Sequence, residues 1–281
     1  MKRMIYRIAK LLNHNSFIGI ESGAKQECLI MGKGIAFGKK IGQTIEVPQD
    51  ARIYSLKELT DRGDAREIIN SVSPVCLELA NEILREAEAE FGDIDRSILF
   101  PIADHLDFAI RRLQRGEQIS NPLTEDIRIL FYKEYKVAGC IAPMLKEKFQ
   151  IELDEHETGY IALHVHSAIV DEKVSQAMEI ARTVRECISL VEKETGNSID
   201  VMSLAYNRLM NHVRYMVARA IHGEKLKMNL NDYMSVKFPE AFHASERICR
   251  EMEKRLGLPM PDIEIGYLAM HLERMLDRET E

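Results

Sequence analysis

The sequence predicts a mainly helical protein with a small antiparallel β domain at its N-terminus, followed by two tandem homologous helical-bundle domains. Three observations lead to this fold class. Residues 1–56 contain short apolar runs broken by glycine, apolar residues recur every three or four positions from about residue 66, and the helical part contains an internal repeat. A length of 281 residues suits two or three compact units. We therefore expect domains at 1–58, 66–172 and 173–281.

The first 56 residues have the pattern of short strands and tight turns. The apolar runs at 17–20 and 28–31 are separated by Glu21-Ser22-Gly23, and four glycines follow within residues 32–42. A unit of this size buries little apolar surface by itself. We therefore expect two copies of the chain to dimerise through this segment.

Helix start signals appear in the remaining sequence. Ser73 followed by Pro74 is typical of an N-cap with proline in the first turn. Asp154 and Glu157 have the spacing of a capping box before another apolar helical pattern. Further helices are expected at 204–220 and 238–256.

A shift of 107 residues superimposes the two helical halves without a gap. The block Gly159–His164 falls on Gly266–His271, and His105 falls on His212. Other matched pairs include Arg112 with Arg219 and Glu157 with Glu264. Shared apolar positions follow from a shared core, but matched histidines do not, because a core has no need of imidazole. The repeat therefore singles out His105, His164, His212 and His271.

Two chemical interpretations of these histidines are weak. A metal site could use His105, His164 and His166, but Glu273 stands at the position equivalent to His166. Hydrolysis of the histidine–aspartate helical type needs the opposite order to Asp104-His105, and its second copy has asparagine at the aspartate position. A buried histidine that simply satisfies its hydrogen bonds remains the ordinary alternative for any one of them.

Phosphate acceptance fits the paired histidines better. A neutral imidazole is a good nucleophile toward an activated phosphoryl donor, and Asp104 could hold the His105 ring in one tautomer. The new charge could then attract nearby arginines. The candidates are Arg111, Arg112, Arg214 and Arg219. Such a protein is a target of phosphorylation and not an enzyme, so no catalytic residue, metal or cofactor is expected.

The net charge of −7 is unevenly distributed. Residues 1–45 contain eight lysines and arginines but only two glutamates, so a basic head precedes an acidic body. The five cysteines form no CxxC pair and are expected to be reduced. No apolar stretch is long enough for a membrane span, and no signal peptide is recognisable, so a cytoplasmic location is expected.

The head carries residue types that suit RNA. The segment MGKGIAFGKK at 31–40 combines glycines, which allow close approach, with lysines and one phenylalanine that could stack on a base. Asn13 and Asn15 could bond to base edges. The absence of a recognition helix favours an RNA loop over a DNA groove. A glycine-rich hairpin with solvated lysines is the plain structural alternative.

Taken together, these motifs resemble the BglG-type transcriptional antiterminators of bacterial sugar phosphotransferase operons. The resemblance is carried by the asparagine segment, by MGKGIAFGKK, and by the blocks ADH, GYIALHVHSA and GYLAMHLERM. The segments GKGIAFGKK and ALHVHSA resemble the glucose-operon branch of this family more closely. The resemblance implies a co-antiterminator RNA-binding domain followed by two phosphotransferase regulation domains.

The resemblance also implies roles for individual residues and partners. The RNA-contacting candidates are Lys10, Asn13, Asn15, Gly32, Lys33 and Phe37, and the phosphorylation candidates are His105, His164, His212 and His271. A dimeric head would hold a hairpin in a leader transcript and exclude a terminator. Phosphorylation by a sugar-specific Enzyme II permease would block this activity, and phosphorylation by HPr would promote it. Many members have arginine where Lys33 stands, and lysine supplies a point charge in place of a planar fork.

Two other functions remain open at this point. The first is a DNA-binding transcriptional activator that uses the same regulation domains. The second is an all-helical metal hydrolase, which would contain bound zinc.

Overall fold

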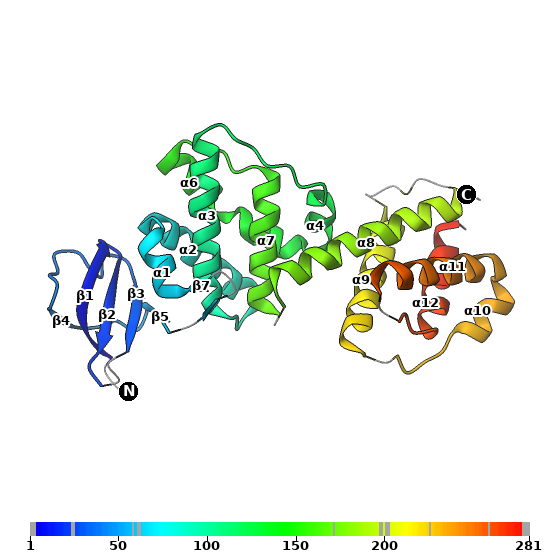
Figure 1. Cartoon of the computed structure of the whole chain (residues 1–281), viewed down its shortest axis with the longest axis horizontal. Coiled ribbons are helices and arrows are strands. Elements are labelled where there is room, and N and C mark those ends of the chain that lie inside the picture. Colours follow the sequence, from blue (N-terminus) through cyan, green and yellow to red (C-terminus); the bar gives the residue numbers. More distant parts are fainter. Residues whose placement is uncertain are drawn as a thin grey trace. The chain divides into compact units, whose positions relative to one another are not determined.

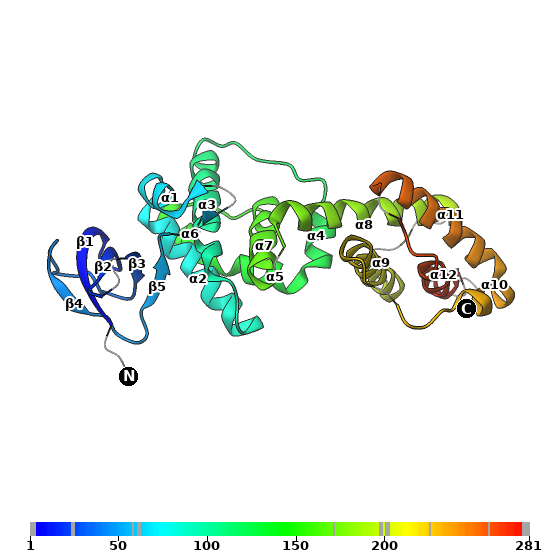
Figure 2. The same ribbon diagram turned by 60° about the horizontal axis from the view of Figure 1, so that its bottom comes forward.

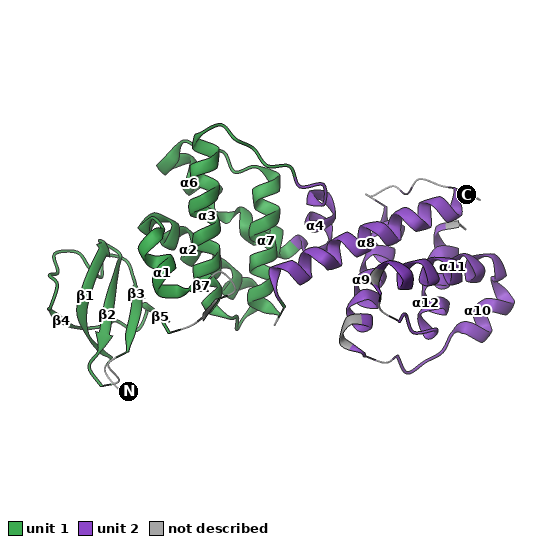
Figure 3. Ribbon diagram, in the orientation of Figure 1, with its two compact units in different colours: residues 1–120, 133–172 green, residues 121–132, 173–281 purple. Residues whose placement is uncertain are grey.

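The computed structural model describes residues 4–23, 26–57, 59–60, 63–170, 172–196, 199, 203–224, 226–257 and 259–276. The chain forms two compact units (Figure 3). The first unit contains residues 1–120 and 133–172, and the second contains residues 121–132 and 173–281. No helix in the described part of the chain combines the length and the apolar character that a bilayer span requires.

The head is a five-stranded antiparallel sheet in the order β4-β1-β2-β3-β5 (Figure 1). Its strands are β1 (Ile5–Asn13), β2 (Ser16–Glu21), β3 (Glu27–Met31), β4 (Thr44–Glu46) and β5 (Arg52–Ser55). A short hairpin of β6 (Leu59–Thr60) and β7 (Gly63–Asp64) follows. The prediction of a small antiparallel β domain at the N-terminus is confirmed.

Buried residues lie on both faces of this sheet. Successive residues of a strand point to opposite sides, and the consecutive residues from Cys28 to Ile30 are all buried. One face forms the head's own core, which includes Tyr6, Ile8, Phe17, Cys28, Ile30, Ala36, Ile45 and Val47. Leu29 and Tyr54 lie outside that cluster and are also buried. The Tyr54 ring packs edge-on against Phe100, with the ring centroids 6.3 Å apart. The helical part of the first unit therefore contributes to covering the second face.

The rest of the first unit is mainly helical. Its elements are α1 (Ala65–Ser71), α2 (Pro74–Phe91), η1 (Arg96–Ile98), α3 (Leu99–Gln114), α5 (Tyr132–Ala138), η2 (Gly139–Ile141), α6 (Ala142–Phe149) and α7 (Glu155–Ile169). Ser73 is the N-cap residue of α2, as expected, with Pro74 in the first turn. Asp154 caps α7 by accepting from the backbone N–H of Glu157. The Glu157 carboxylate itself turns into the protein interior instead of completing a capping box.

Every regular element among the described residues of the second unit is a helix. Its elements are α4 (Thr124–Leu130), α8 (Val174–Thr195), α9 (Leu204–His222), α10 (Asn231–Lys237), α11 (Pro239–Leu256) and α12 (Ile263–Leu276). The helices expected at 204–220 and 238–256 correspond to α9 and α11 within two residues at each end. Figure 2 gives a second view of these helices.

Helix α4 occupies a different place from its partner in the repeat. The 107-residue shift places α4 at the position of α10, which packs on α11 and α12. Helix α4 instead packs on α8 and α9 in the second unit. Arg214 Nη1 donates to the Leu130 carbonyl at 3.2 Å, and Ile127 and Leu130 are buried there. The two copies of the repeat thus place the same helix in different surroundings.

Candidate functional site

The turn between β1 and β2 fixes the two asparagines of the head. Asn13 Oδ1 accepts from the Asn15 backbone N–H at 2.8 Å and from Ser16 Oγ at 2.9 Å. Asn15 Oδ1 accepts from the Gly34 backbone N–H at 2.8 Å. Each side-chain oxygen is therefore used inside the head. Both NH₂ groups are left to donate to a partner beyond the turn.

The glycine-rich turn lies directly against this hairpin. Ala36 N–H donates to the His14 carbonyl, and Gly32 N–H donates to the Asn15 carbonyl. Gly34 has φ of +66°, a conformation that residues with a side chain rarely adopt. The turn holds Phe37 outward with 68% of its surface exposed. Its ring meets the edge of the His14 ring at a centroid distance of 5.3 Å.

The structure brings most of the predicted RNA-contacting residues to one end of the head. Asn13 and Asn15 lie on one turn, and the segment from Gly32 to Phe37 is bonded to it. Lys33 is exposed on that segment. Lys10 lies farther back on β1, where its ammonium donates to Asn70 Oδ1 at 2.8 Å.

In the first unit, His105 and His164 lie side by side on α3 and α7. Their ring centroids are 5.5 Å apart. Glu157, which is fully buried, contacts Arg112 through Oε1 and has Oε2 3.2 Å from His105 Nε2. The His105 and Glu157 atoms touch without the alignment of a hydrogen bond. Burial alone would raise the pKa of Glu157, but His105 and Arg112 hold that pKa below its ordinary value.

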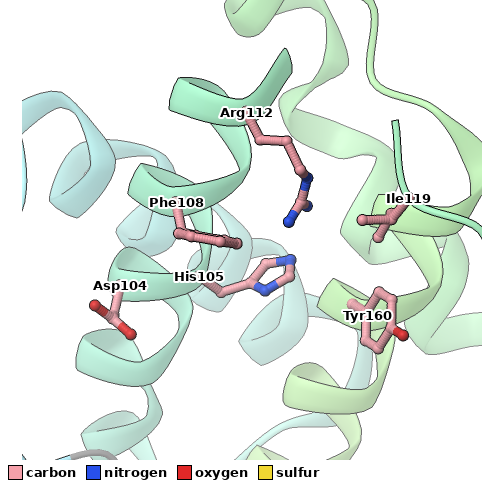
Figure 4. Close-up of a pocket in the computed structure, with 6 residues that line it drawn as sticks. All are labelled: Asp104, His105, Phe108, Arg112, Ile119 and Tyr160. Atoms are coloured by element: carbon pink, nitrogen blue, oxygen red, sulfur yellow. The ribbon is translucent and has the colours of Figure 1, made fainter. Parts of the chain in front are cut away.

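A cavity of about 430 Å³ opens at the His105 ring (Figure 4). Phe108, Arg112, Ile119 and Tyr160 line it together with Asp104 and His105. Figure 4 shows the Asp104 carboxylate pointing away from the His105 ring. The expectation that Asp104 orients His105 is therefore wrong, because neighbouring residues of a helix face different directions. The carboxylate in contact with the ring belongs to Glu157.

The second unit repeats the histidine pair with a different geometry. The rings of His212 and His271 stack at 4.6 Å with an interplanar angle of 25°. Glu264 holds Arg219 with both carboxylate oxygens, at 2.7 and 2.8 Å. A cavity of about 480 Å³ is lined by Arg219 but not by His212.

Burial favours the neutral form of both histidines of the second unit. It lowers the pKa of His212 to about 3, assisted by the neighbouring His271 and Arg219. Burial also lowers the pKa of His271, with Arg274 and Arg208 adding to the effect. The neutral imidazole keeps a lone pair and is the form that attacks a phosphoryl donor.

The sequence interpretation missed the contribution of the buried glutamates. Glu157 and Glu264 were visible as a repeat-matched pair, and each lies next to a repeat-matched arginine in the fold. A glutamate and an arginine that are both matched by the 107-residue shift could have indicated an ion pair in each copy. His166, one of the three candidate metal ligands, has Nδ1 2.9 Å from Glu134 Oε1. Among the described residues, no three side chains of metal-binding type converge.

Two known protein families together match nearly the whole chain. The family described as "PRD domain" matches residues 67–168 and 185–275. The family described as "CAT RNA binding domain" matches residues 6–62. The PRD matches alone cover more than half of the chain.

Several similar proteins are named as regulators of transcription. The transcription antiterminator LicT of Bacillus subtilis is 27% identical over 96% of this chain and 99% of its own length. The beta-glucoside operon antiterminator of Dickeya chrysanthemi is 26% identical, and coverage is 96% of each protein. Protein GlcT of Staphylococcus haemolyticus is 26% identical over 95% of each.

A solved structure agrees with the first part of the fold. The crystal structure of GlcT CAT-PRDI is 28% identical and superimposes with a TM-score of 0.50, covering 59% of this chain and 99% of that one. An antiparallel head, two repeated helical domains and both family matches therefore coincide along one sequence. The chain belongs to the PRD-domain family, with a CAT RNA-binding domain ahead of its two PRD domains.

Proposed function

We propose that this protein is a transcriptional antiterminator that binds an RNA hairpin in the leader transcript of a sugar phosphotransferase operon. The observation that carries the proposal is the set of side chains gathered at one end of the CAT domain. There, the NH₂ groups of Asn13 and Asn15 are not used inside the head, and an exposed lysine and an exposed phenylalanine lie on the adjacent turn. Relatives that match over almost their full length are named antiterminators.

The residue chemistry supports RNA as the ligand of this surface. Asn13 and Asn15 donate to acceptor oxygens, Lys33 neutralises phosphate, and Phe37 stacks on an unpaired base. Gly32 lets the backbone approach closely, and Lys10 extends the basic surface along β1. The stem of the hairpin would then be held by charge and its loop by stacking.

The paired histidines are proposed as phosphorylation sites that regulate the head. His105 and His164 serve in the first PRD domain, and His212 and His271 serve in the second. The donors are phosphorylated HPr and a sugar-specific Enzyme II, and the chain acts as a homodimer. A phosphate with about two negative charges at the His105 ring would compete with Glu157 for Arg112, which changes the packing between α3 and α7.

An affinity measurement tests the RNA proposal. Phe37→Ala in the full chain is expected to weaken binding of a selected hairpin RNA about tenfold, because base stacking on one aromatic ring contributes about 1–3 kcal/mol. Tyr233→Ala is the matched control, because Tyr233 is 58% exposed but lies on α10 in the second unit. Equal losses in both variants, or equal binding of a DNA duplex, would contradict the proposal.

Mass spectrometry tests the phosphorylation proposal. Incubation of the full chain with phosphorylated HPr and a sugar permease is expected to add acid-labile phosphate to at least one of the four histidines. Peptide mapping identifies the site, and an unchanged intact mass would contradict the proposal.

A further inference from the structure

In this structure, the NH₂ groups of Asn13 and Asn15 both donate to a residue of the first PRD domain. Asn13 Nδ2 and Asn15 Nδ2 donate to the same oxygen, Glu78 Oε1, at 2.9 and 2.8 Å. Glu78 lies on α2, more than sixty residues farther along the chain. Its second oxygen is 3.1 Å from Lys148 Nζ. A carboxylate therefore lies where two amide donors converge.

The two amides are set to donate before any partner arrives. Bonds inside the head hold Oδ1 of both asparagines, so only the NH₂ groups can face outward. Ser16, which supplies one of those bonds, is fully buried. A fixed pair of N–H donors selects an oxygen acceptor and binds a charged oxygen most strongly. Glu78 and a phosphate oxygen of RNA offer the same chemistry to this pair.

A second predicted RNA-contacting position is also engaged by the PRD domain. Lys10 Nζ donates to Asn70 Oδ1 on α1 at 2.8 Å. Lys10, Asn13 and Asn15 therefore all contact α1 or α2, while Lys33 and Phe37 stay exposed. An RNA that needs all five residues cannot reach them together in this arrangement.

The head is attached to the PRD domain by further contacts along β5. Tyr54 donates from its hydroxyl to Asn81 Oδ1 at 2.7 Å, and Arg52 Nη2 lies 2.8 Å from Glu88 Oε2. The contact of Tyr54 with Phe100 adds apolar area between the same partners. The contact of the asparagines with Glu78 is thus one part of a packed interface.

We infer that Glu78 is an internal competitor for RNA, which holds the Asn13–Asn15 donor pair closed until the head separates from α1 and α2. This inference rests on the RNA-binding function proposed above. The apparent affinity for RNA equals the intrinsic affinity reduced by the fraction of molecules that are open. Loss of the Glu78 charge should therefore tighten binding without any change in the RNA-binding residues themselves.

Comparison of full-length variants tests the inference. The probe is a fluorescein-labelled hairpin RNA. It is selected beforehand from a library of hairpins with a randomised internal loop. The selection target is an equal mixture of the unaltered chain and the Glu78→Gln variant. Glu78→Gln is expected to bind this hairpin about tenfold more tightly than the unaltered chain. Glu86→Gln removes the same charge from the same helix, where Glu86 is near Arg85, and should leave the affinity unchanged.

A second variant guards against a folding defect in the first. Asn70→Ala removes the partner of Lys10 and should also tighten binding, by a few-fold, because a single hydrogen bond is lost. If all chains bind the hairpin and neither Glu78→Gln nor Asn70→Ala binds it more tightly than Glu86→Gln, the competitor role is refuted and RNA binding stands. If no chain retains any hairpin, the proposed function fails and this inference fails with it.

Discussion

The two PRD domains contain the same four residues at the same spacing, two histidines, an arginine and a glutamate, but connect them differently. In the first, Glu157 divides its oxygens between Arg112 and His105, and the His105 ring lines an open cavity. In the second, Glu264 gives both oxygens to Arg219, and the histidine rings stack on each other.

This difference shows how a duplicated sequence can acquire two sensitivities. His105 is linked to a buried ion pair, so added charge at its ring disturbs Arg112 and Glu157 directly. Among the described residues, His212 Nε2 has no hydrogen-bond partner, and burial lowers the pKa of the ring, with the neighbouring His271 and Arg219 adding to the effect. We therefore expect a phosphate at His105 to be felt through the ion pair, and a change at His212 to be felt through the ring stack.

The largest effect is expected from neutralising the buried glutamates. Glu157→Gln leaves the Arg112 guanidinium buried without its countercharge, which should lower the free energy of unfolding by about 3 kcal/mol. Glu264→Gln should cause a similar loss in the second unit. Urea unfolding followed by circular dichroism measures the loss, and hydrogen exchange assigns it to α7 or α12.

Glu152→Gln provides the control for this pair of variants. Glu152 pairs with Lys146 at the surface, where 83% of its side chain is exposed, so its loss should change stability by less than about 0.5 kcal/mol. If Glu157→Gln is no more destabilising than this control, the buried ion pair does not hold α3 against α7.

The next effect tests whether access to the two sites differs. Ile119→Trp partly fills the cavity at His105 and should slow phosphorylation of the first PRD domain about tenfold, because small misplacements of reacting groups are costly. Leu226→Trp alters the equivalent position in the second PRD domain, where the cavity is not lined by His212. This variant should leave the rate of phosphorylation at His212 unchanged, as measured by peptide mass spectrometry over time. If both variants slow phosphorylation of their domains equally, the two histidines do not differ in access.

The smallest effect concerns acid. The folded state lowers the pKa of His212 below its ordinary value near 6.5, so the unfolded chain binds a proton that the folded chain refuses. The stability due to this site is complete above about pH 6.5 and declines as the pH falls toward about 3. Between pH 6.5 and 5.5 the expected loss is about 1 kcal/mol.

Urea unfolding at several pH values measures the acid effect. His212→Asn should flatten the dependence, whereas His243→Asn should not, because 66% of the His243 side chain is exposed. A chain whose pH profile is the same with and without His212 would show that the ring is protonated easily in the fold.

Much of the fold and the choice of the four histidines could be predicted, because helical periodicity and the internal repeat are both visible in the sequence. Apolar spacing predicts the helices, and the repeat singled out His105, His164, His212 and His271. Only the fold shows that His105 lies beside His164 and His212 beside His271, with ring centroids 5.5 and 4.6 Å apart. The glycines and apolar runs of the head likewise predicted its strands.

Other features depend on contacts between distant segments, which no local pattern encodes. The spacing of Asp154 and Glu157 suggested a capping box, yet a buried arginine from another helix attracted the Glu157 carboxylate. Adjacency in sequence suggested Asp104 as the partner of His105, although a helix turns the two side chains apart. The contact of Asn13 with Glu78 joins two elements whose meeting depends on the packing of the whole head.

The position of α4 has a consequence for any attempt to exchange regulatory modules between relatives. The polypeptide enters the second unit at residue 121, returns to the first at residue 133 and leaves it again at residue 173. A fusion made at residue 172 would transplant α8 and α9 while leaving behind the helix that lies on them, and Ile127 and Leu130 would lose their cover. A chimaera that keeps its regulation intact must therefore take residues 121–132 and residues 173–281 from the same parent.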